Sequence, residues 1–303
     1  MKTKLSDRLV RGPVLGMQGP GVCQRLRAVL GVALLTALPA SAEKIMWTNV
    51  NGGSWSVETN WDPNLEPGPS DEATIGNYQV VVHGGASVKK LTFSGGTLRV
   101  EGGLAVRELF FERGTISGDG TVTVNGQMDW SAGVMDGTGR TVIAPGATLN
   151  LNNQEAVTIY YRTLENVGTV LWNGQGNLNV AQGAVLTNCP GAVWEVYNDG
   201  TFRWPSFGNT PRFDNAGIFR KSFSWGVTTF ICFPFNNYIT GTVEVQSGTV
   251  FYRETAGAPG STFNQSGVVN VSGGAVLRLG ADGTGNGPFR VESGGMVDWT
   301  GSY

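Results

Sequence analysis

Between residues 114 and 151 the chain consists of short runs in which apolar and polar residues alternate. Turns that contain glycine separate these runs. The runs at 121–124, 127–130, 141–144 and 148–151 each place apolar side chains on alternate residues or in a short pair. A period of two is typical of a β-strand that buries one face. Each run is too short to form a domain alone, so the pattern predicts strands that stack on one another.

The same unit recurs along most of the chain. It returns as Gly-Thr-Val or Gly-Ala-Val followed by apolar alternation, at residues 168–172, 191–196, 241–245 and 274–279. Further strands are expected at 78–82, 88–93, 97–100, 104–106 and 109–111, with glycine pairs between several of them. Comparable corners recur at intervals of roughly 19–26 residues, which accommodates about three strands per rung.

This variable repeat predicts an all-β solenoid. A left-handed hexapeptide helix would keep a stricter period, so we expect a right-handed parallel β-helix with about three short strands per rung. Val243 is expected to point inward from its strand and Glu244 outward. Two proline- or aromatic-rich segments, 198–214 and 221–237, are expected to contain loops that project from the rod.

The composition agrees with this architecture. The chain has 303 residues, of which 46 are glycine, 40% are hydrophobic and 15% are charged. It is too apolar for a disordered protein and too rich in glycine for an ordinary helical domain. Sustained helical periodicity is confined to the first forty residues.

Residues 1–42 have the features of a signal peptide. Arg25 and Arg27 precede the apolar run 28–38, and Ala40-Ser-Ala42 follows as a cleavage site. The apolar run is much shorter than the roughly 20 residues needed to span a membrane. The first residues form a long polar leader, so either Met1 or Met17 could be the start. We therefore expect a secreted or cell-surface protein.

The net charge restricts the partners. The chain has 21 basic and 23 acidic residues, and removal of 1–42 takes away six basic residues and one acid, leaving a net charge of −7. An acidic protein is poorly suited to binding nucleic acid or anionic membranes.

The cysteines are not expected to form a disulfide. Cys23 lies in the leader, and Cys189 and Cys232 fall about two rungs apart, which is too far for a disulfide.

Residues 43–77 differ from the repeats because three tryptophans, Trp47, Trp55 and Trp61, fall close together. Large aromatics can cover the exposed end of a solenoid, so we expect a capping segment here and solenoid repeats over 78–303. A sugar-binding platform is the alternative interpretation.

Several stretches resemble known proteins. The N-terminal stretch 53–75, with Trp55, Asn60-Trp61 and Asp71-Glu-Ala-Thr-Ile75, is similar to the opening of many bacterial exported β-solenoid proteins. Residues 213–221 and 235–249 resemble their repeats, although Tyr238-Ile239 is an insertion. This resemblance, to adhesin-like β-solenoid repeat proteins, implies a surface location and no enzyme activity.

Catalytic and metal-binding patterns are weak. Polysaccharide-degrading enzymes also occur on β-helices and need two nearby carboxylates; the candidate pairs are Asp119 with Asp136, Asp129 with Glu108, and Glu195 with Asp214. Asp119 and Asp136, like Asp199 and Asp282, precede glycine, which is typical of turns. His83 lies in a corner, and residues 281–287 only faintly match a calcium-binding loop. We expect no enzyme activity, no metal and no cofactor.

The leading hypothesis is a non-enzymatic structural or adhesive solenoid. Trp204 and Trp225 are expected in exposed loops and could stack on sugar rings, so a carbohydrate-binding module is the second hypothesis. A polysaccharide-degrading enzyme is the third. Extracellular glycans or other surface proteins are the expected partners.

The last residues, 295–303, begin another strand without a cap. We expect either further chain or self-association through the C-terminal rung, at Val297.

Overall fold

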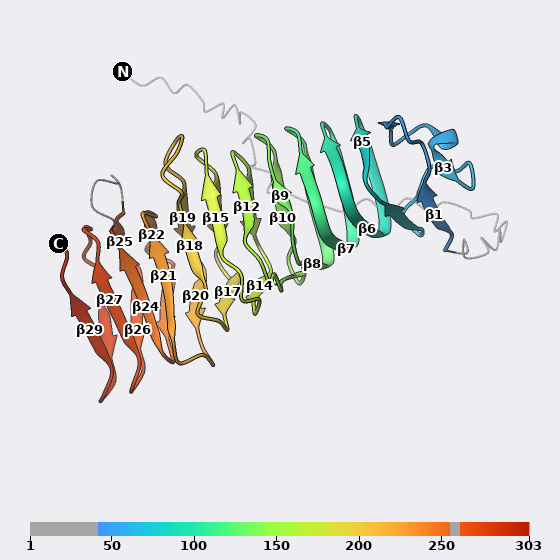
Figure 1. Ribbon diagram of the computed structural model, residues 1–303. Helices are drawn as coiled ribbons and strands as arrows, with labels where there is room; N and C mark the ends of the chain where they lie inside the picture. Colours follow the sequence, from blue (N-terminus) through green and yellow to red (C-terminus); the bar gives the residue numbers. More distant parts are fainter. Residues whose placement is uncertain (1–41, 255–260, 303) are drawn as a thin grey trace, which may run out of the picture. The chain divides into compact units, whose positions relative to one another are not determined.

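The computed structural model describes residues 42–254 and 261–302, and these form a solenoid of stacked parallel β-strands (Figure 1). The predicted all-β solenoid is therefore confirmed; its right-handed sense stays a prediction. The predicted signal peptide, apart from Ala42, lies outside the described residues.

From β10 to β24, each strand pairs in parallel with the third strand after it, so three strands make one turn; at the C-terminal end β26 pairs with β28 and β27 pairs with β29. The first sheet face contains β10 (Arg140–Ile143), β13 (Thr163–Asn166), β16 (Val185–Asn188), β19 (Arg212–Asn215), β22 (Phe235–Asn237) and β25 (Phe263–Gln265). The second contains β11 (Thr148–Leu151), β14 (Thr169–Trp172), β17 (Val193–Val196), β20 (Ile218–Lys221), β23 (Thr242–Val245), β26 (Val268–Val271) and β28 (Phe289–Val291). The third contains β12 (Val157–Tyr160), β15 (Leu178–Ala181), β18 (Thr201–Arg203), β21 (Val227–Ile231), β24 (Thr249–Arg253), β27 (Val276–Gly280) and β29 (Met296–Trp299).

The turns before β10 run through longer, bent strands, which are β6 (Gly85–Val100), β7 (Gly103–Ser117) and β8 (Thr121–Trp130), followed by the short β9 (Val134–Met135). The separate strands predicted at 88–93 and 97–100 are thus parts of one strand, and the intervening glycines are bends within it. Gly96 shows why glycine is needed there: its φ is +71°, and a Cβ would lie 1.9 Å from the carbonyl oxygen of Tyr78.

The N-terminal segment already contains strands in register with the solenoid. β1 (Lys44–Trp47) pairs in parallel with β4 (Glu72–Ile75), and β2 (Gly53–Ser54) pairs with β5 (Tyr78–Val82). β3 (Trp61–Asp62) runs antiparallel to β1 after the short 3₁₀ helix η1 (Glu58–Asn60). Trp47, Trp55 and Trp61 are all buried, and the ring of Trp61 packs edge-on against both others. Their burial favours capping over a sugar-binding platform.

The core consists of columns of side chains that stack from turn to turn. Phe93, Phe111 and Trp130 occupy equivalent positions and stack with centroid separations of 5.6 and 5.8 Å. Phe202, Phe230 and Tyr252 form a second stack, at 4.3 and 4.6 Å. Aromatic contacts of this kind add to the burial of apolar area that stabilises the solenoid.

A buried ladder of amide side chains runs along one corner of this core. The Asn166, Asn188, Asn215 and Asn237 amides each donate to the next side chain in the series, which ends at Gln265, over 2.7–2.9 Å. The bonded residues lie 22, 27, 22 and 28 positions apart, whereas His83 and Glu101, on successive turns near the N-terminus, are 18 apart. The turns therefore vary somewhat more in length than the 19–26 residues predicted.

A second buried polar group, the Arg162 guanidinium, stabilises a corner nearer the N-terminus. Arg162 has no exposed surface, and its guanidinium donates to Thr141 Oγ1 and to four backbone carbonyls, those of Gly118, Gly120, Asp136 and Arg140. Burial lowers the pKa of Arg162 to about 10, so it still carries its charge at neutral pH.

The predicted inward and outward positions near the C-terminus are confirmed. Val243 is fully buried, in register with Phe219 and Val269, while Glu244 points outward and accepts a hydrogen bond from Arg220.

Cys189 and Cys232 form no disulfide with each other. Residues 204–211 form a loop, and the segment 221–237 has non-strand stretches at 222–226 and 232–234 on either side of β21, so both segments contain loops as expected.

The C-terminal strands β28 and β29 continue the register, with Val297 packed against the core. Self-association through this rung stays a prediction.

The described part of the chain contains no helix that is long and apolar enough to cross a membrane.

Candidate functional site

The two tryptophans predicted as ligand contacts lie in different environments. Trp225 is 81% exposed, in the turn between β20 and β21. Trp204 is only 6% exposed, and its indole N–H donates to the carbonyl of Phe207. The expected exposure of Trp204 is therefore wrong, because its ring packs into the core at the end of β18. Of these two tryptophans, Trp225 alone presents its ring to solvent.

Trp225 lies two residues after Phe223, whose ring contacts Tyr197, and we call these three residues the aromatic corner. Phe223 is 78% exposed, and its ring packs edge-on against Tyr197 at 5.2 Å. The backbone of Phe223 has a φ of +66°, a conformation that is strained for a bulky side chain. The turn thus holds two large aromatic rings in solvent and tolerates strain at one of them.

A polar cleft of about 410 Å³ lies beside the aromatic corner. Its lining residues come from three successive turns of the solenoid and are Asn173, Gln175, Tyr197, Asn198, Asp199, Gly200 and Ser224. The side-chain amides of Asn173 and Gln175 are exposed and make no hydrogen bond to another described residue. The cleft therefore offers donors and acceptors that remain available to a ligand.

Lys221 positions the loops that carry this site. It is the last residue of β20 and occupies an inward position, in register with Val196 and Val245. Its ammonium is buried and donates to Asn198 O, Asp199 Oδ1, Ser224 Oγ and Thr228 Oγ1 over 2.5–3.0 Å. One buried cation thus ties the loop around residue 198 to the loop that carries Phe223 and Trp225.

The ionisation of this site follows from burial. Burial lowers the pKa of Lys221, and Asp199 partly opposes that shift. Burial and the nearby Glu195 carboxylate raise the pKa of Tyr197, so its hydroxyl stays protonated at neutral pH. The exposed charge of the cleft is the carboxylate of Asp199, whose side chain is 48% exposed.

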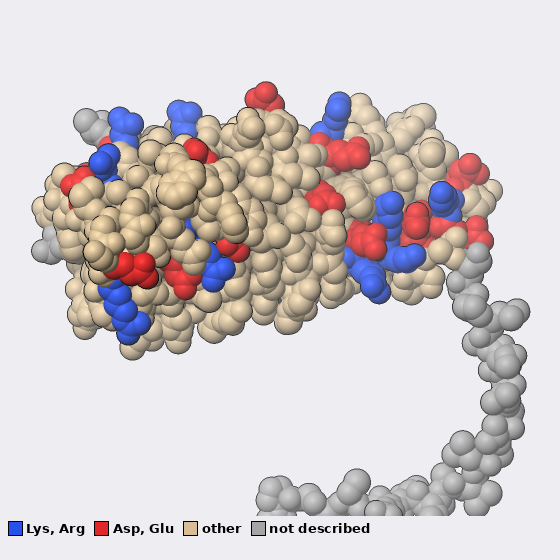
Figure 2. Space-filling model, turned by 90° about the horizontal axis from the view of Figure 1, so that it is seen from below, with Lys and Arg blue, Asp and Glu red and all other residues tan. Residues whose placement is uncertain are grey.

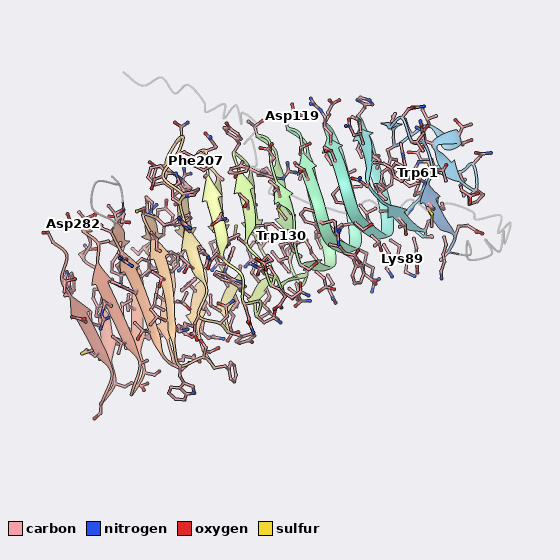
Figure 3. The ribbon with its side chains drawn as sticks, viewed as in Figure 1. Trp61, Lys89, Asp119, Trp130, Phe207 and Asp282 are labelled. Carbon is pink, nitrogen blue, oxygen red and sulfur yellow. The ribbon has the colours of Figure 1, made fainter. Side chains whose placement is uncertain are left out.

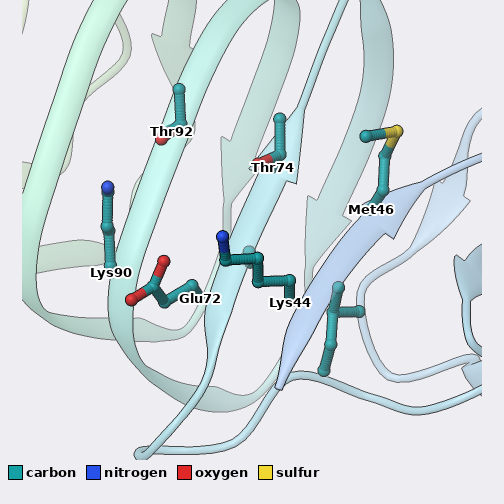
Figure 4. Close-up of a pocket in the computed structure, with 8 residues that line it drawn as sticks. Lys44, Met46, Glu72, Thr74, Lys90 and Thr92 are labelled. Atoms are coloured by element: carbon teal, nitrogen blue, oxygen red, sulfur yellow. The ribbon is translucent and has the colours of Figure 1, made fainter. Parts of the chain in front are cut away.

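A second hollow, of about 280 Å³, lies on the outer surface of β1, β4 and β6 (Figure 4). Outward side chains in two rows line it, with Lys44, Glu72 and Lys90 in one row and Met46, Thr74 and Thr92 in the other. Lys90 also lies 4.9 Å from the centroid of the Phe110 ring. Charges of both signs alternate within this hollow, so it favours no single class of charged ligand.

The charged side chains as a whole form no single-sign surface on the face shown in Figure 2. Acidic and basic groups lie next to each other toward the two ends of this face, and its middle is mostly uncharged. Ion pairs between successive turns, such as Arg220 with Glu244 and Arg278 with Asp298, join oppositely charged side chains of the solenoid. Such pairs are typical of a solvated outer sheet surface.

Two of the predicted carboxylate pairs lie on neighbouring turns of the solenoid, and the third lies on two different sheet faces. Asp119 lies on the upper edge of the solenoid in Figure 3 and lines an open corner together with Asp136. Asp136 accepts a hydrogen bond from the Gly137 N–H, as in a turn. Asp129, one strand from Glu108, accepts hydrogen bonds from Gln127 and Asn150.

The third pair lies on two different sheet faces, because Glu195 is on β17 and Asp214 is on β19. Each has its own partners: Glu195 accepts from Ser222, and Asp214 accepts from Arg212 and Asn236. The structure therefore does not bring Glu195 and Asp214 together as a catalytic pair.

The remaining residues singled out from the sequence have structural contacts. His83 is exposed and lies 2.6 Å from the Glu101 carboxylate. In the segment 281–287, Asp282 accepts a hydrogen bond from the Ser302 N–H. Across residues 42–254 and 261–302, no group of three histidine, cysteine, aspartate or glutamate side chains is placed to hold a metal ion.

The sequence did not identify Tyr197, Asp199 and Lys221 as parts of this site. A signal existed for Lys221, since a lysine occupies the fourth position of a strand whose second position is the buried Phe219. No alternation pattern could identify Tyr197 or Asp199, which lie in a turn.

Comparison of the chain with protein-family models, with curated proteins and with solved structures gave no match.

Proposed function

We propose that this chain is an exported, non-enzymatic β-solenoid that acts as an adhesive spacer outside the cell or on its surface. The aromatic corner is the observation that carries the proposal. Trp225 is the most exposed of the described tryptophans, and Phe223, two residues before it, is also exposed and has a strained backbone conformation. Exposed aromatic rings beside polar groups are typical of recognition surfaces.

The continuity of the solenoid supports the spacer role. The parallel pairing extends from β4 to β29 across the described residues, and the amide ladder adds buried hydrogen bonds over five successive turns. A repeat structure of this kind can hold a binding corner away from the surface to which it is anchored. The resemblance of residues 53–75, 213–221 and 235–249 to bacterial adhesin-like solenoids supports the same role, and a signal peptide over 1–42 would export the protein.

A non-catalytic role is supported by the partners of the carboxylates. Asp129, Asp136, Glu195 and Asp214 each accept hydrogen bonds from the protein itself. These bonds suit structural positions, since a general acid or base needs its proton-exchanging atom free to reach a substrate. Release of reducing sugars from polysaccharides by the purified protein would contradict this part of the proposal.

Beads coated with the protein (residues 43–303) are expected to resist detachment by flow on at least one of three films, made of mucin glycoprotein, collagen and cellulose. Trp225→Ala should reduce the retained fraction at least tenfold, because the substitution removes the largest exposed ring of the corner. Bead retention at fixed shear is the measurement.

Ile239→Ala is the matched control, since Ile239 is 82% exposed but lies in a different turn, after β22. It should leave retention unchanged. Equal losses with both variants would indicate non-specific hydrophobic sticking, and no retention of wild-type beads on any film would contradict an adhesive role.

A further inference from the structure

We propose that the aromatic corner and its cleft bind a neutral polysaccharide chain. The inference rests on the proposed adhesive function and deepens it by naming the class of ligand. It rests on three kinds of group that lie on consecutive turns. These are the exposed rings of Phe223 and Trp225, the side-chain amides of Asn173 and Gln175, and the exposed carboxylate of Asp199.

The exposed aromatic rings can cover the apolar face of a sugar ring. A sugar ring has faces of C–H groups and a rim of hydroxyls, so an aromatic ring can cover a face while polar groups reach the rim. Trp225 and Phe223 present rings of the required size to solvent, and Tyr197, which contacts Phe223, extends the aromatic surface into the cleft.

The cleft offers polar groups to the hydroxyl rim of the sugar. The amides of Asn173 and Gln175 each offer donors and an acceptor, and Asp199 keeps one carboxylate oxygen, Oδ2, without a hydrogen bond to another described residue. Asn173 and Gln175 lie in one turn, Asp199 lies in the next, and Ser224 lines the cleft from a third. Since turns stack about 4.8 Å apart, the cleft spans about 10 Å along the solenoid, which suits a chain ligand better than a small ion.

The charge of the cleft selects against acidic sugars. None of the seven lining residues is basic, and the nearest cation that contacts them, Lys221, is buried and already bonded to four oxygens. A uronate carboxylate would approach Asp199 with no accessible cation to neutralise it. Neutral sugars meet no such repulsion, and their hydroxyls can donate to Asp199.

Affinity electrophoresis of the protein (residues 43–303) tests this inference, in native gels that contain hydroxyethylcellulose, galactomannan or polygalacturonate. We expect a neutral polymer to retard the wild type and polygalacturonate to have no effect. Trp225→Ala and Phe223→Gly should each weaken the retardation by about tenfold. Phe223→Gly also removes the positive-φ strain, so it should fold, and a thermal melt of each variant checks this.

Asp199→Asn tests the charge argument directly. The asparagine can still accept from Lys221, so we expect neutral binding to persist and retardation by polygalacturonate to appear. Ile239→Ala should match the wild type throughout. Retardation of the wild type by polygalacturonate, or an unchanged Trp225→Ala variant, would overturn the inference. Absence of retardation by both neutral polymers, with beads still retained through Trp225, would overturn the glycan assignment and leave the adhesive function intact.

Discussion

Replacement of Val243 by Asp is expected to lower the free energy of unfolding by about 3–5 kcal/mol. Val243 has no exposed surface and stacks between Phe219 and Val269, so a carboxylate there would lie unpaired within an apolar column. A urea melt followed by circular dichroism measures the change.

The neighbouring residue provides the control. Glu244→Gln should cost about 1 kcal/mol or less, since Glu244 faces outward and its bond to Arg220 is partly exposed to water. If the two variants melt at the same urea concentration, the assignment of inward and outward positions along β23 is incorrect.

The second large effect is expected in the amide ladder. Asn215→Leu should destabilise the protein by about 2–4 kcal/mol, because leucine keeps much of the volume but breaks the ladder in its middle. The Asn188 amide would lose one of its two acceptors and keep the Ile218 carbonyl, and Asn237 Oδ1 would lose its donor, both in a buried environment.

Asn179→Leu is the matched substitution for this test. Asn179 points outward from β15 and makes no hydrogen bond to a described side chain, so the change should alter stability by less than about 0.5 kcal/mol. Comparable destabilisation by both variants would show that the ladder contributes no more than any surface asparagine.

The fold could be predicted because its signals are local and repeated. Alternation with a period of two marks the strands, and glycine marks corners such as Gly96, where a side chain would collide with the preceding turn. The amide ladder left a signal too: Asn166, Asn188, Asn215 and Asn237 each end a strand at an inward position. In the sequence that signal is ambiguous, because asparagine near glycine is ordinarily a turn residue.

The candidate site was only partly predictable, because it is assembled across turns. The sequence predicts an exposed loop position for both Trp225 and Trp204. The Trp225 ring is exposed, whereas the Trp204 ring is buried beneath the loop that follows it. The role of Lys221 depends on oxygens contributed by residues up to 23 positions away. Such a network requires the register of successive turns, which the sequence gives only approximately.

The most direct test of the account is hydroxyl-radical footprinting of the protein on the film that retains its beads. Trp225 is expected to be oxidised several-fold more slowly on the film than in solution, while Trp299, which is 42% exposed near the C-terminal end, keeps its solution rate. That result would place the contact at the aromatic corner. Retained protein in which Trp225 is oxidised as fast as in solution would contradict the account.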